Sequence, residues 1–184
     1  MSDTADLPDD FIPPTSPEAL FARLADLGIE TRTVEHPPLF TVEDSQRLRG
    51  TIQGGHTKNL FLKDKKGNVF LVVVEEDARV DLKTLHTVLG AASRLSFGSA
   101  DLLKELLGVT PGAVTAFGPV NDAGGRVAVV LDAALMRHGE INCHPLVNTA
   151  TTTIGRDDLV AFLRATGHEP RILDVPKVAE AGDA

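Results

Sequence analysis

The sequence predicts a single α+β domain whose sheet is largely antiparallel, and three observations support this fold class. The chain has 184 residues, which is enough for one domain with a sizeable core. Its hydrophobic content of 42% and charged content of 24% are ordinary for a folded globular protein. Its apolar segments follow one another as hairpins with interspersed helices, instead of the regular βαβ order of a parallel sheet.

The two ends of the chain are set apart from its middle. Residues 1–15 are rich in Asp and Pro and contain few apolar side chains, so we expect a disordered or loosely attached arm. The last segment with a strand pattern ends at Val175. We therefore divide the chain into an N-terminal arm (1–15), a folded domain (16–175) and a C-terminal tail (176–184).

Helix signals occur in five segments. Ser16, Asp81 and Ser99 each precede an apolar stripe with helical spacing, and their side chains are typical of N-caps. Gly90 and Gly108 are typical of the residue that follows a helix. The predicted helices are 17–27, 42–49, 82–89, 100–107 and 156–166, the second of them preceded by a sequence at Thr41 that is similar to a capping box.

Strand signals alternate with these helices. Segment 69–75 is apolar at successive positions, so both of its faces should be buried in the centre of the sheet. Together with 59–63 it predicts a hairpin, and 112–117 with 126–131 predicts a second one. The other predicted strands are 29–34, 94–97, 140–143, 150–154 and 170–175.

The charge distribution restricts the class of partner. A net charge of -8 argues against a protein that coats nucleic acid, because such binding needs many Lys and Arg contacts to phosphates. Segment 47–66 is an exception, since its six basic residues and one acidic residue give a local charge of +5. This segment suits a short contact with an RNA end, although part of it, Lys65 and Lys66, also fits the solvated tip of a hairpin.

The usual signatures of several enzyme classes are missing from the sequence. It contains no H-E-x-x-H, no G-x-S-x-G and no P-loop motif, which argues against zinc proteolysis, elbow-type serine hydrolysis and nucleotide hydrolysis. Six scattered histidines and one cysteine do not form a metal-ligand pattern, so we expect neither a metal nor another cofactor. With no apolar run of about 18 residues and no secretory signal, we expect a cytoplasmic protein without membrane association.

The single cysteine, Cys143, is a weak candidate for a nucleophile. A thiol usually needs a nearby base or a cationic setting to become a thiolate. Its neighbour His144 should point to the opposite face if both lie on a strand. Covalent catalysis by Cys143 therefore has little support from the sequence.

The stretch from Gly54 to Phe61 is the strongest candidate for a functional site. Gly54 and Gly55 permit a tight loop, and the apolar residues that follow predict a strand. Lys58 would then lie where the loop becomes the strand. The alternative reading is a plain turn followed by a solvated strand start.

Three motifs give this chain a resemblance to a known family. They are Lys-Asn-Leu-Phe-Leu at 58–62, Asn-Cys-His-Pro-Leu at 142–146 and Asn-Thr-Ala-Thr-Thr-Thr at 148–153. In this order they resemble the freestanding relatives of the editing domain of prolyl-tRNA synthetase, and more narrowly the deacylases that remove alanine from mischarged proline tRNA. The similarity extends over about residues 17–175, and it implies a curved, barrel-like mixed sheet flanked by helices.

The resemblance also implies roles for individual residues. Lys58 would hold the terminal phosphate or the developing negative charge, and Asn59 would orient the tRNA end. His144, restricted by the proline that follows it, would border the aminoacyl pocket, and the alternative is a histidine that is hydrogen-bonded within a polar loop. Attack by water, helped by the neighbouring hydroxyl of the substrate's own ribose, would need no catalytic triad.

A fourth motif of the family departs from its pattern here. The G-x-x-x-P loop matches residues 112–116, with Ala116 in place of proline, which puts the rigidity of the loop in question. Gly112 and Thr115 would offer backbone amides and a hydroxyl to the substrate. Ala116 belongs to the same predicted substrate-binding loop.

These expectations define a function and its alternatives. We expect hydrolysis of the ester of mischarged tRNA(Pro), chiefly Ala-tRNA(Pro), because a synthetase pocket shaped for proline cannot strongly exclude the smaller alanine. The expected partner is the acceptor end of tRNA(Pro), with prolyl-tRNA synthetase or other translation factors as candidate protein partners. The sequence leaves the oligomeric state open. The alternatives are an inactive tRNA-binding or regulatory homologue and, with less support, a DNA-binding protein.

Overall fold

The protein is described here from a computed structural model that covers residues 15–38 and 42–179. The predicted N-terminal arm up to residue 14, the Thr41 cap and the end of the tail from residue 180 lie outside the described residues. Within the described part no helix is long and apolar enough to cross a membrane.

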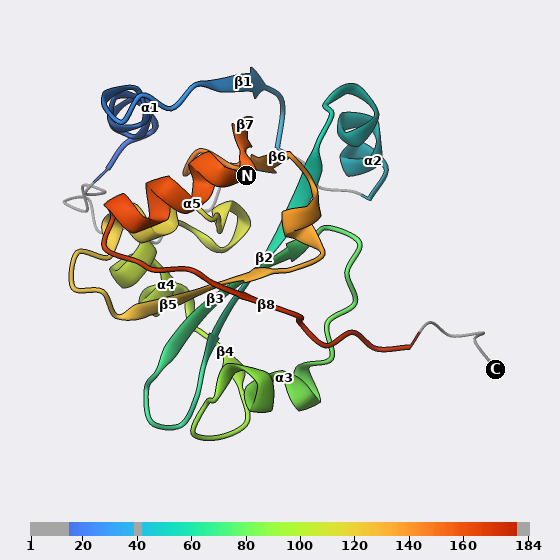
Figure 1. Cartoon of the computed structure of the whole chain (residues 1–184), viewed down its shortest axis with the longest axis vertical. Helices are drawn as coiled ribbons and strands as arrows, with labels where there is room; N and C mark the ends of the chain where they lie inside the picture. Colours follow the sequence, from blue (N-terminus) through green and yellow to red (C-terminus); the bar gives the residue numbers. More distant parts are fainter. Residues whose placement is uncertain (1–14, 39–41, 180–184) are drawn as a thin grey trace.

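An eight-stranded mixed sheet organises the fold (Figure 1). Its strand order is β1-β7-β6-β2-β3-β5-β8, and β4 pairs separately with β2. Four pairings are antiparallel, and three are parallel: β2 with β6, β3 with β5, and β5 with β8. The predicted α+β class and mixed sheet are confirmed, and the sheet is open, with β1 and β8 at the ends of its path. The strands are β1 Thr31–Glu35, β2 Gly55–Lys63, β3 Val69–Glu75, β4 Ser96–Phe97, β5 Val127–Asp132, β6 Glu140–Cys143, β7 Ala150–Gly155 and β8 Arg171–Leu173.

Three helices begin where the sequence places their caps. The Ser16 hydroxyl accepts a hydrogen bond from the N–H of Ala19 (3.1 Å), and Asp81 and Ser99 cap their helices in the same way. The α-helices are α1 Pro17–Asp26, α2 Val42–Thr51, α3 Leu82–Leu89, α4 Ala100–Leu107 and α5 Arg156–Ala165. Three short 3₁₀ helices are η2 Pro111–Ala113, η3 Gly118–Asn121 and η4 Leu135–Arg137.

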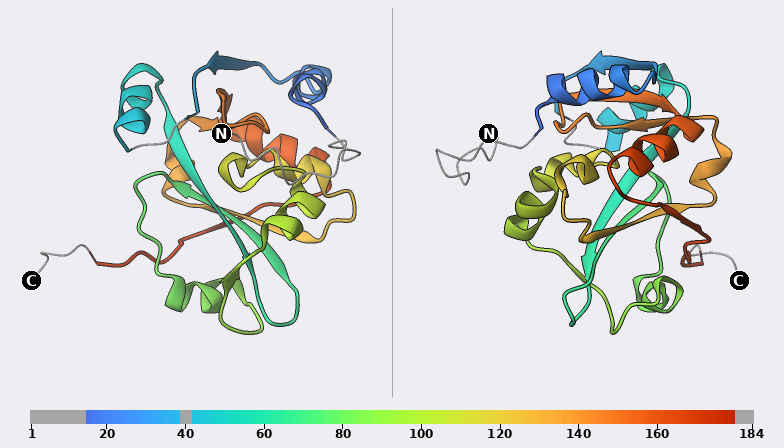
Figure 2. Two further views of the ribbon diagram at one scale, coloured as in Figure 1. Left: turned by 180° about the vertical axis from the view of Figure 1, so that it is seen from behind. Right: turned by 60° about the vertical axis from the view of Figure 1, so that its left-hand side comes forward.

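Strand β3 separates two hydrophobic cores, as its apolar sequence predicts. Leu71 and Val73 point into a large core that includes residues of α1, α4 and α5, whereas Val72 and Val74 point into a smaller core beneath α3. Figure 2 shows α3 near the tip of the β2–β3 hairpin and α2 near the start of β2. The hairpin therefore links two distinct ends of the molecule.

The second predicted hairpin is wrong. Strand β5 pairs in parallel with β3, and residues 111–121 form two 3₁₀ turns instead of a strand. The fully buried Thr115 explains the difference, because its hydroxyl donates to the carbonyl of His144 at 2.6 Å and accepts from the N–H of Phe117 at 3.2 Å. This contact holds the segment around Thr115 against the loop that carries His144, so the segment does not pair with β5 as predicted.

Candidate functional site

Strand β2 begins earlier than the sequence predicts. Gly55 and His56 pair in parallel with Ile141 and Asn142 of β6, so the strand starts at Gly55 and Lys58 lies within it. The prediction of Lys58 at the junction of loop and strand is therefore wrong. The close approach of β6 explains the first glycine: Gly54 has φ of 105°, and a Cβ there would lie 2.9 Å from the carbonyl oxygen of Glu140.

The two parallel strands separate directly after this pairing. The last β2–β6 pair is His56 with Asn142, and β2 gains its next partner on that edge only at Leu62, which pairs with Phe97. We call the intervening separation the β2–β6 opening. Lys58 and His144 each lie two residues beyond the last pair, so they occupy equivalent positions on the two sides of the opening.

The hydrogen-bond pattern shows which backbone groups face this opening. The N–H of Glu76 donates to the carbonyl of His56 (2.9 Å), so even-numbered residues of β2 bond to β3. The N–H of Gly98 donates to the carbonyl of Phe61 (2.9 Å), so odd-numbered residues point to the other edge. The N–H and C=O of Asn59 therefore point toward the β2–β6 opening.

Strand alternation places the side chains of Lys58 and Asn59 on opposite faces. Phe61 belongs to the large core and Leu62 to the small one. Asn59 shares the face of Phe61, and Lys58 shares the face of Leu62. The two predicted catalytic residues thus flank the same strand instead of meeting side by side.

The ammonium of Lys58 is held by the turn that follows β3. Its side chain is half-buried, and Nζ donates to the backbone carbonyl of Ala78. An ammonium has three N–H donors, so a single carbonyl partner directs the group and leaves donors for a ligand.

The side-chain oxygen of Asn59 is buried and has no hydrogen-bond partner among the described residues. Leaving such an acceptor unpaired costs on the order of 1–3 kcal/mol. Buried polar atoms of this kind are uncommon and call for an explanation. A ligand that donates a hydrogen bond at this position would supply one.

One ring nitrogen of His144 hydrogen-bonds to the backbone of the 145–150 loop. Nδ1 lies 3.1 Å from the carbonyl oxygen of Ala150, which can only accept, so Nδ1 carries the proton and Nε2 holds the lone pair of the neutral ring. Burial lowers the pKa of His144, outweighing the opposite effects of the hydrogen bond to the Ala150 carbonyl and of the Glu76 carboxylate. The imidazole is therefore neutral near pH 7.

The predicted 112–116 loop contacts the backbone of His144. Thr115 holds the His144 carbonyl, and both Thr115 and Ala116 are fully buried. Gly112 is exposed, and a Cβ added there would lie 3.4 Å from the side-chain nitrogen of Asn148. The structure thus brings the two loops together, with Gly112 open to solvent and the other two residues in a supporting position.

Residues without an assigned role also shape this region. The Asn142 side chain donates to the carbonyl of Gln53 (3.0 Å) and accepts from the Thr153 hydroxyl (2.5 Å), which ties β6 to β7 and to the loop before β2. His36 Nε2 lies 2.8 Å from the Thr151 hydroxyl. Asn142 and both threonines belong to the motifs at 142–146 and 148–153. The sequence therefore marked these residues but did not indicate what each of them does.

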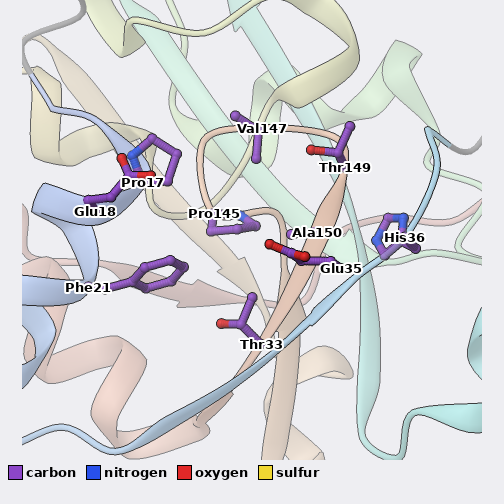
Figure 3. A pocket seen from close by; sticks show the side chains of 10 residues that line it. All are labelled: Pro17, Glu18, Phe21, Thr33, Glu35, His36, Pro145, Val147, Thr149 and Ala150. Carbon is purple, nitrogen blue, oxygen red and sulfur yellow. The ribbon is translucent and has the colours of Figure 1, made fainter.

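A cavity of about 640 Å³ lies on the α1 side of the 145–150 loop (Figure 3). Two carboxylates, Glu18 and Glu35, border it beside the aromatic ring of Phe21, which makes it unsuited to phosphate. Its lining consists of Pro17, Glu18, Phe21, Thr33, Glu35, His36, Pro145, Val147, Thr149 and Ala150. Neither Lys58 nor Asn59 borders it, so it is distinct from the β2–β6 opening.

The environment of Cys143 does not favour a thiolate. The residue is 2% exposed, and burial raises its pKa to about 12, against a smaller opposite effect of the Thr57 side chain. Among the described residues no group of three or more His, Cys, Asp or Glu side chains is placed to hold a metal ion.

Comparisons with known proteins agree on one family. A family model described as "Aminoacyl-tRNA editing domain" matches residues 36–162. Prolyl-tRNA editing protein ProX of Acetoanaerobium sticklandii is 36% identical over 159 residues, which cover 86% of this chain and 96% of that protein. Prolyl-tRNA synthetase associated domain-containing protein 1 of Danio rerio is 44% identical over 149 residues, 80% of each chain.

A solved structure supports the same fold. The crystal structure of a candidate trans-editing enzyme for prolyl tRNA synthetase matches with a TM-score of 0.66 at 23% identity. The match covers 89% of this chain and 99% of that one.

Proposed function

The chain belongs to the aminoacyl-tRNA editing domain family, and from this premise we propose that it is a deacylase that hydrolyses the ester of mischarged tRNA(Pro), with Ala-tRNA(Pro) as its main substrate. It would act in trans, on tRNA already released from the synthetase. The observation that carries the proposal is the β2–β6 opening, which has a cation on β2 and a neutral imidazole directly after the end of β6.

The reaction needs charge stabilisation more than a nucleophilic side chain. Water adds to the ester carbonyl carbon, the bond from that carbon to the ribose oxygen breaks, and the ribose oxygen takes up a proton. Negative charge develops on the carbonyl oxygen during the first step. The free N–H donors of Lys58 would stabilise this charge or hold the terminal phosphate.

Asn59 and His144 suit the other end of the substrate. The unpaired oxygen of Asn59 can accept a hydrogen bond from the α-ammonium or from a ribose hydroxyl. A protonated His144 would repel the α-ammonium, and burial avoids this because it keeps the ring neutral. Water attack with help from the ribose hydroxyl beside the ester then requires no further base from the protein.

Selection of alanine over proline would come from the loop that carries His144. Each methylene that a pocket loses or gains is worth only about 1–3 kcal/mol, so a synthetase cannot fully reject the smaller alanine. A second pocket that is too small for the pyrrolidine ring reverses the selection. The contact between Thr115 and the His144 carbonyl would keep the wall of this pocket in place.

The contact with RNA would be short. Lys65 and Lys66 lie at the hairpin tip, and Lys63 follows Lys58 by five positions, or about 17 Å along the strand. The basic segment therefore divides between the opening and the far end of the hairpin. This supports the acceptor end of tRNA(Pro) as partner, with the synthetase as a further partner suggested by the synthetase-associated relatives. We place the activity in the cytoplasm, where these components meet.

The test is hydrolysis of alanyl-, seryl- and prolyl-tRNA(Pro) by the purified protein. We expect release of alanine well above the uncatalysed rate and little release of proline. Equal rates on the alanyl and prolyl substrates would refute the editing assignment. Binding of tRNA without any hydrolysis would favour an inactive homologue instead.

A further inference from the structure

The C-terminal segment pairs with the turn that holds the Lys58 ammonium. We define the strap as residues 174–178 and the β3–α3 turn as residues 76–81. The N–H of Asp81 donates to the carbonyl of Pro176, and the N–H of Val178 donates to the carbonyl of Arg79, each at 2.8 Å. Val80 and Lys177 form an isolated antiparallel bridge between these two bonds.

An ion pair between a buried carboxylate and a partly exposed lysine connects the strap to the sheet. Asp132, at the end of β5, is 1% exposed, and its two oxygens accept from the Val175 N–H (3.1 Å) and from Lys177 Nζ (2.7 Å). Lys177 Nζ also donates to the carbonyl of Val175 at 2.8 Å. Loss of the Lys177 cation would leave the buried Asp132 charge with only the Val175 N–H as a partner among the described residues, so the ion pair helps to fix the position of the strap.

The turn and the strap border the same cavity. Its volume is about 480 Å³, and it is lined by Glu75, Asp77, Ala78, Arg79, Ala134, Lys177, Val178 and Ala179. The N–H of Glu76 and the N–H of Ala78 bond to the carbonyls of His56 and Glu75 at the start of the turn, and the two backbone bonds to the strap hold its second half. Ala78, whose carbonyl accepts from Lys58, is one residue away from the bonded Arg79.

We propose that Lys177 and Asp132 are positioning residues that set the place of the Lys58 ammonium through the strap and the β3–α3 turn. Lysine ends in a compact charge on a flexible stem, so its location depends on the group that receives its hydrogen bond. Displacing the Ala78 carbonyl by about 1 Å would move the ammonium away from the charge that it is proposed to stabilise. The catalytic consequence rests on the proposed deacylase function, whereas the structural link does not.

The experiment compares Lys177→Met with Lys177→Arg and with Arg171→Met. Arginine keeps a cation that can reach Asp132. Arg171 is a matched control, because it also lies in the C-terminal region but donates to the carbonyl of Leu89, away from the turn. If Lys177→Met does not fold, the Asp132→Asn/Lys177→Met pair removes both charges and serves in its place.

Three measurements distinguish a change in the position of the Lys58 ammonium from a general loss of stability. For Lys177→Met we expect kcat for Ala-tRNA(Pro) to fall about 10-fold with KM nearly unchanged. We expect amide hydrogen exchange at residues 76–81 to increase at least 10-fold, and acetylation of Lys58 by acetic anhydride, relative to Lys63 in the same sample, to increase several-fold. Lys177→Arg should restore most of each value, and Arg171→Met should change none.

The outcomes distinguish this inference from the proposed function. Faster exchange in the turn without a change in Lys58 labelling or in kcat would overturn the positioning role. Unchanged exchange in the turn would overturn the strap itself. A parent protein that hydrolyses no aminoacyl-tRNA would refute the function, while exchange and labelling would still decide the link between Lys177 and Lys58.

Discussion

The buried polar side chains at the two ends of the β2–β3 hairpin differ in whether their oxygens accept hydrogen bonds. At the tip, Asp64 is 4% exposed, and its carboxylate accepts four hydrogen bonds, from the N–H groups of Lys66, Asn68 and Ala92 and from the Asn68 side chain, at 2.8 to 3.0 Å. At the β2–β6 opening, the oxygen of Asn59 is buried without a partner in the described part of the chain.

From this difference we infer that the tip serves stability, and we propose that the opening serves a ligand. Four donors stabilise the charged form of Asp64 and lower its pKa to about 2, so the tip is complete by itself. The opening has a buried acceptor without a partner among the described residues and a cation that donates to one carbonyl, and we propose that a bound substrate supplies the missing partners. Substitutions at the two ends should therefore have opposite effects on activity and stability.

The largest effect is expected for Lys58→Ala. Loss of the cation should lower kcat/KM for Ala-tRNA(Pro) by roughly 10²- to 10³-fold, the range found when one charge-stabilising donor is removed. The free energy of unfolding should change little, because the side chain is half-buried and makes one hydrogen bond. Lys63→Ala, at the other end of the same strand, is the control and should keep parental turnover. A Lys58→Ala protein as active as the parent would contradict the mechanism.

Asn59→Leu should separate activity from stability. We expect a roughly 10-fold lower rate of deacylation, because the acceptor for the substrate is lost. The free energy of unfolding should stay the same or rise by about 1 kcal/mol, since an unpaired buried oxygen is removed. Urea denaturation alongside kinetics measures both. In the control, Asn68→Ala removes a partner of Asp64 and should lower stability without lowering the rate.

His144→Ala should change the preference between substrates. If the ring borders the aminoacyl pocket, its removal should narrow the ratio of alanyl to prolyl hydrolysis about 10-fold. Burial lowers the pKa of His144 from its ordinary value of 6.5, so the ring in the parent protein becomes protonated only below that pH. The fall in the deacylation rate of the parent at acid pH should therefore also lie below pH 6.5. A variant with lower stability and an unchanged ratio would indicate a structural histidine.

Asp64→Asn should affect stability alone. The pKa of Asp64 falls from 3.8 to about 2 on folding, so its charged form stabilises the fold above about pH 4, and this contribution is lost as the pH falls toward 2. The variant should unfold several degrees below the parent at pH 7 and lack this part of the pH dependence. Thermal melts of parent and variant between pH 2 and 7 measure this pH dependence. Loss of deacylation in a folded Asp64→Asn variant would contradict the assignment of stability to the tip and activity to the opening.

The smallest effect is expected for Cys143→Ala. A buried thiol with a pKa near 12 is not a nucleophile at neutral pH, so turnover should stay within about 2-fold of the parent. Single-turnover assays under reducing conditions are sufficient. Loss of several orders of magnitude with the fold preserved would favour covalent catalysis.

Features encoded by neighbouring residues could be predicted from the sequence. The Ser16, Asp81 and Ser99 caps and the bounds of β3 depend on local signals, and all are confirmed. The start of β2 could not be predicted, because it depends on pairing with Asn142, 86 residues away from His56. The false strand at 112–117 has the same cause, since Thr115 bonds to the distant His144 carbonyl.

The candidate site divides in the same way. Its residue types came from motifs, whereas its geometry depends on the parallel pairing of β2 and β6 and on where that pairing stops. Alternation along β2 made the opposite orientation of Lys58 and Asn59 predictable in principle, once both were placed inside the strand. The strap contact to the turn behind Lys58 has no local signature, because Lys177 and Asp132 are 45 residues apart.

The most direct test maps the binding of an RNA minihelix that carries the tRNA(Pro) acceptor end and a non-hydrolysable 3′-alanylamide. We expect the largest NMR shift changes at residues 57–61 and 144–149, including the side-chain amide of Asn59, with residues 64–68 at the tip unchanged. Shifts concentrated at the hairpin tip, or in the cavity beside Phe21, would contradict the assignment of the β2–β6 opening as the site.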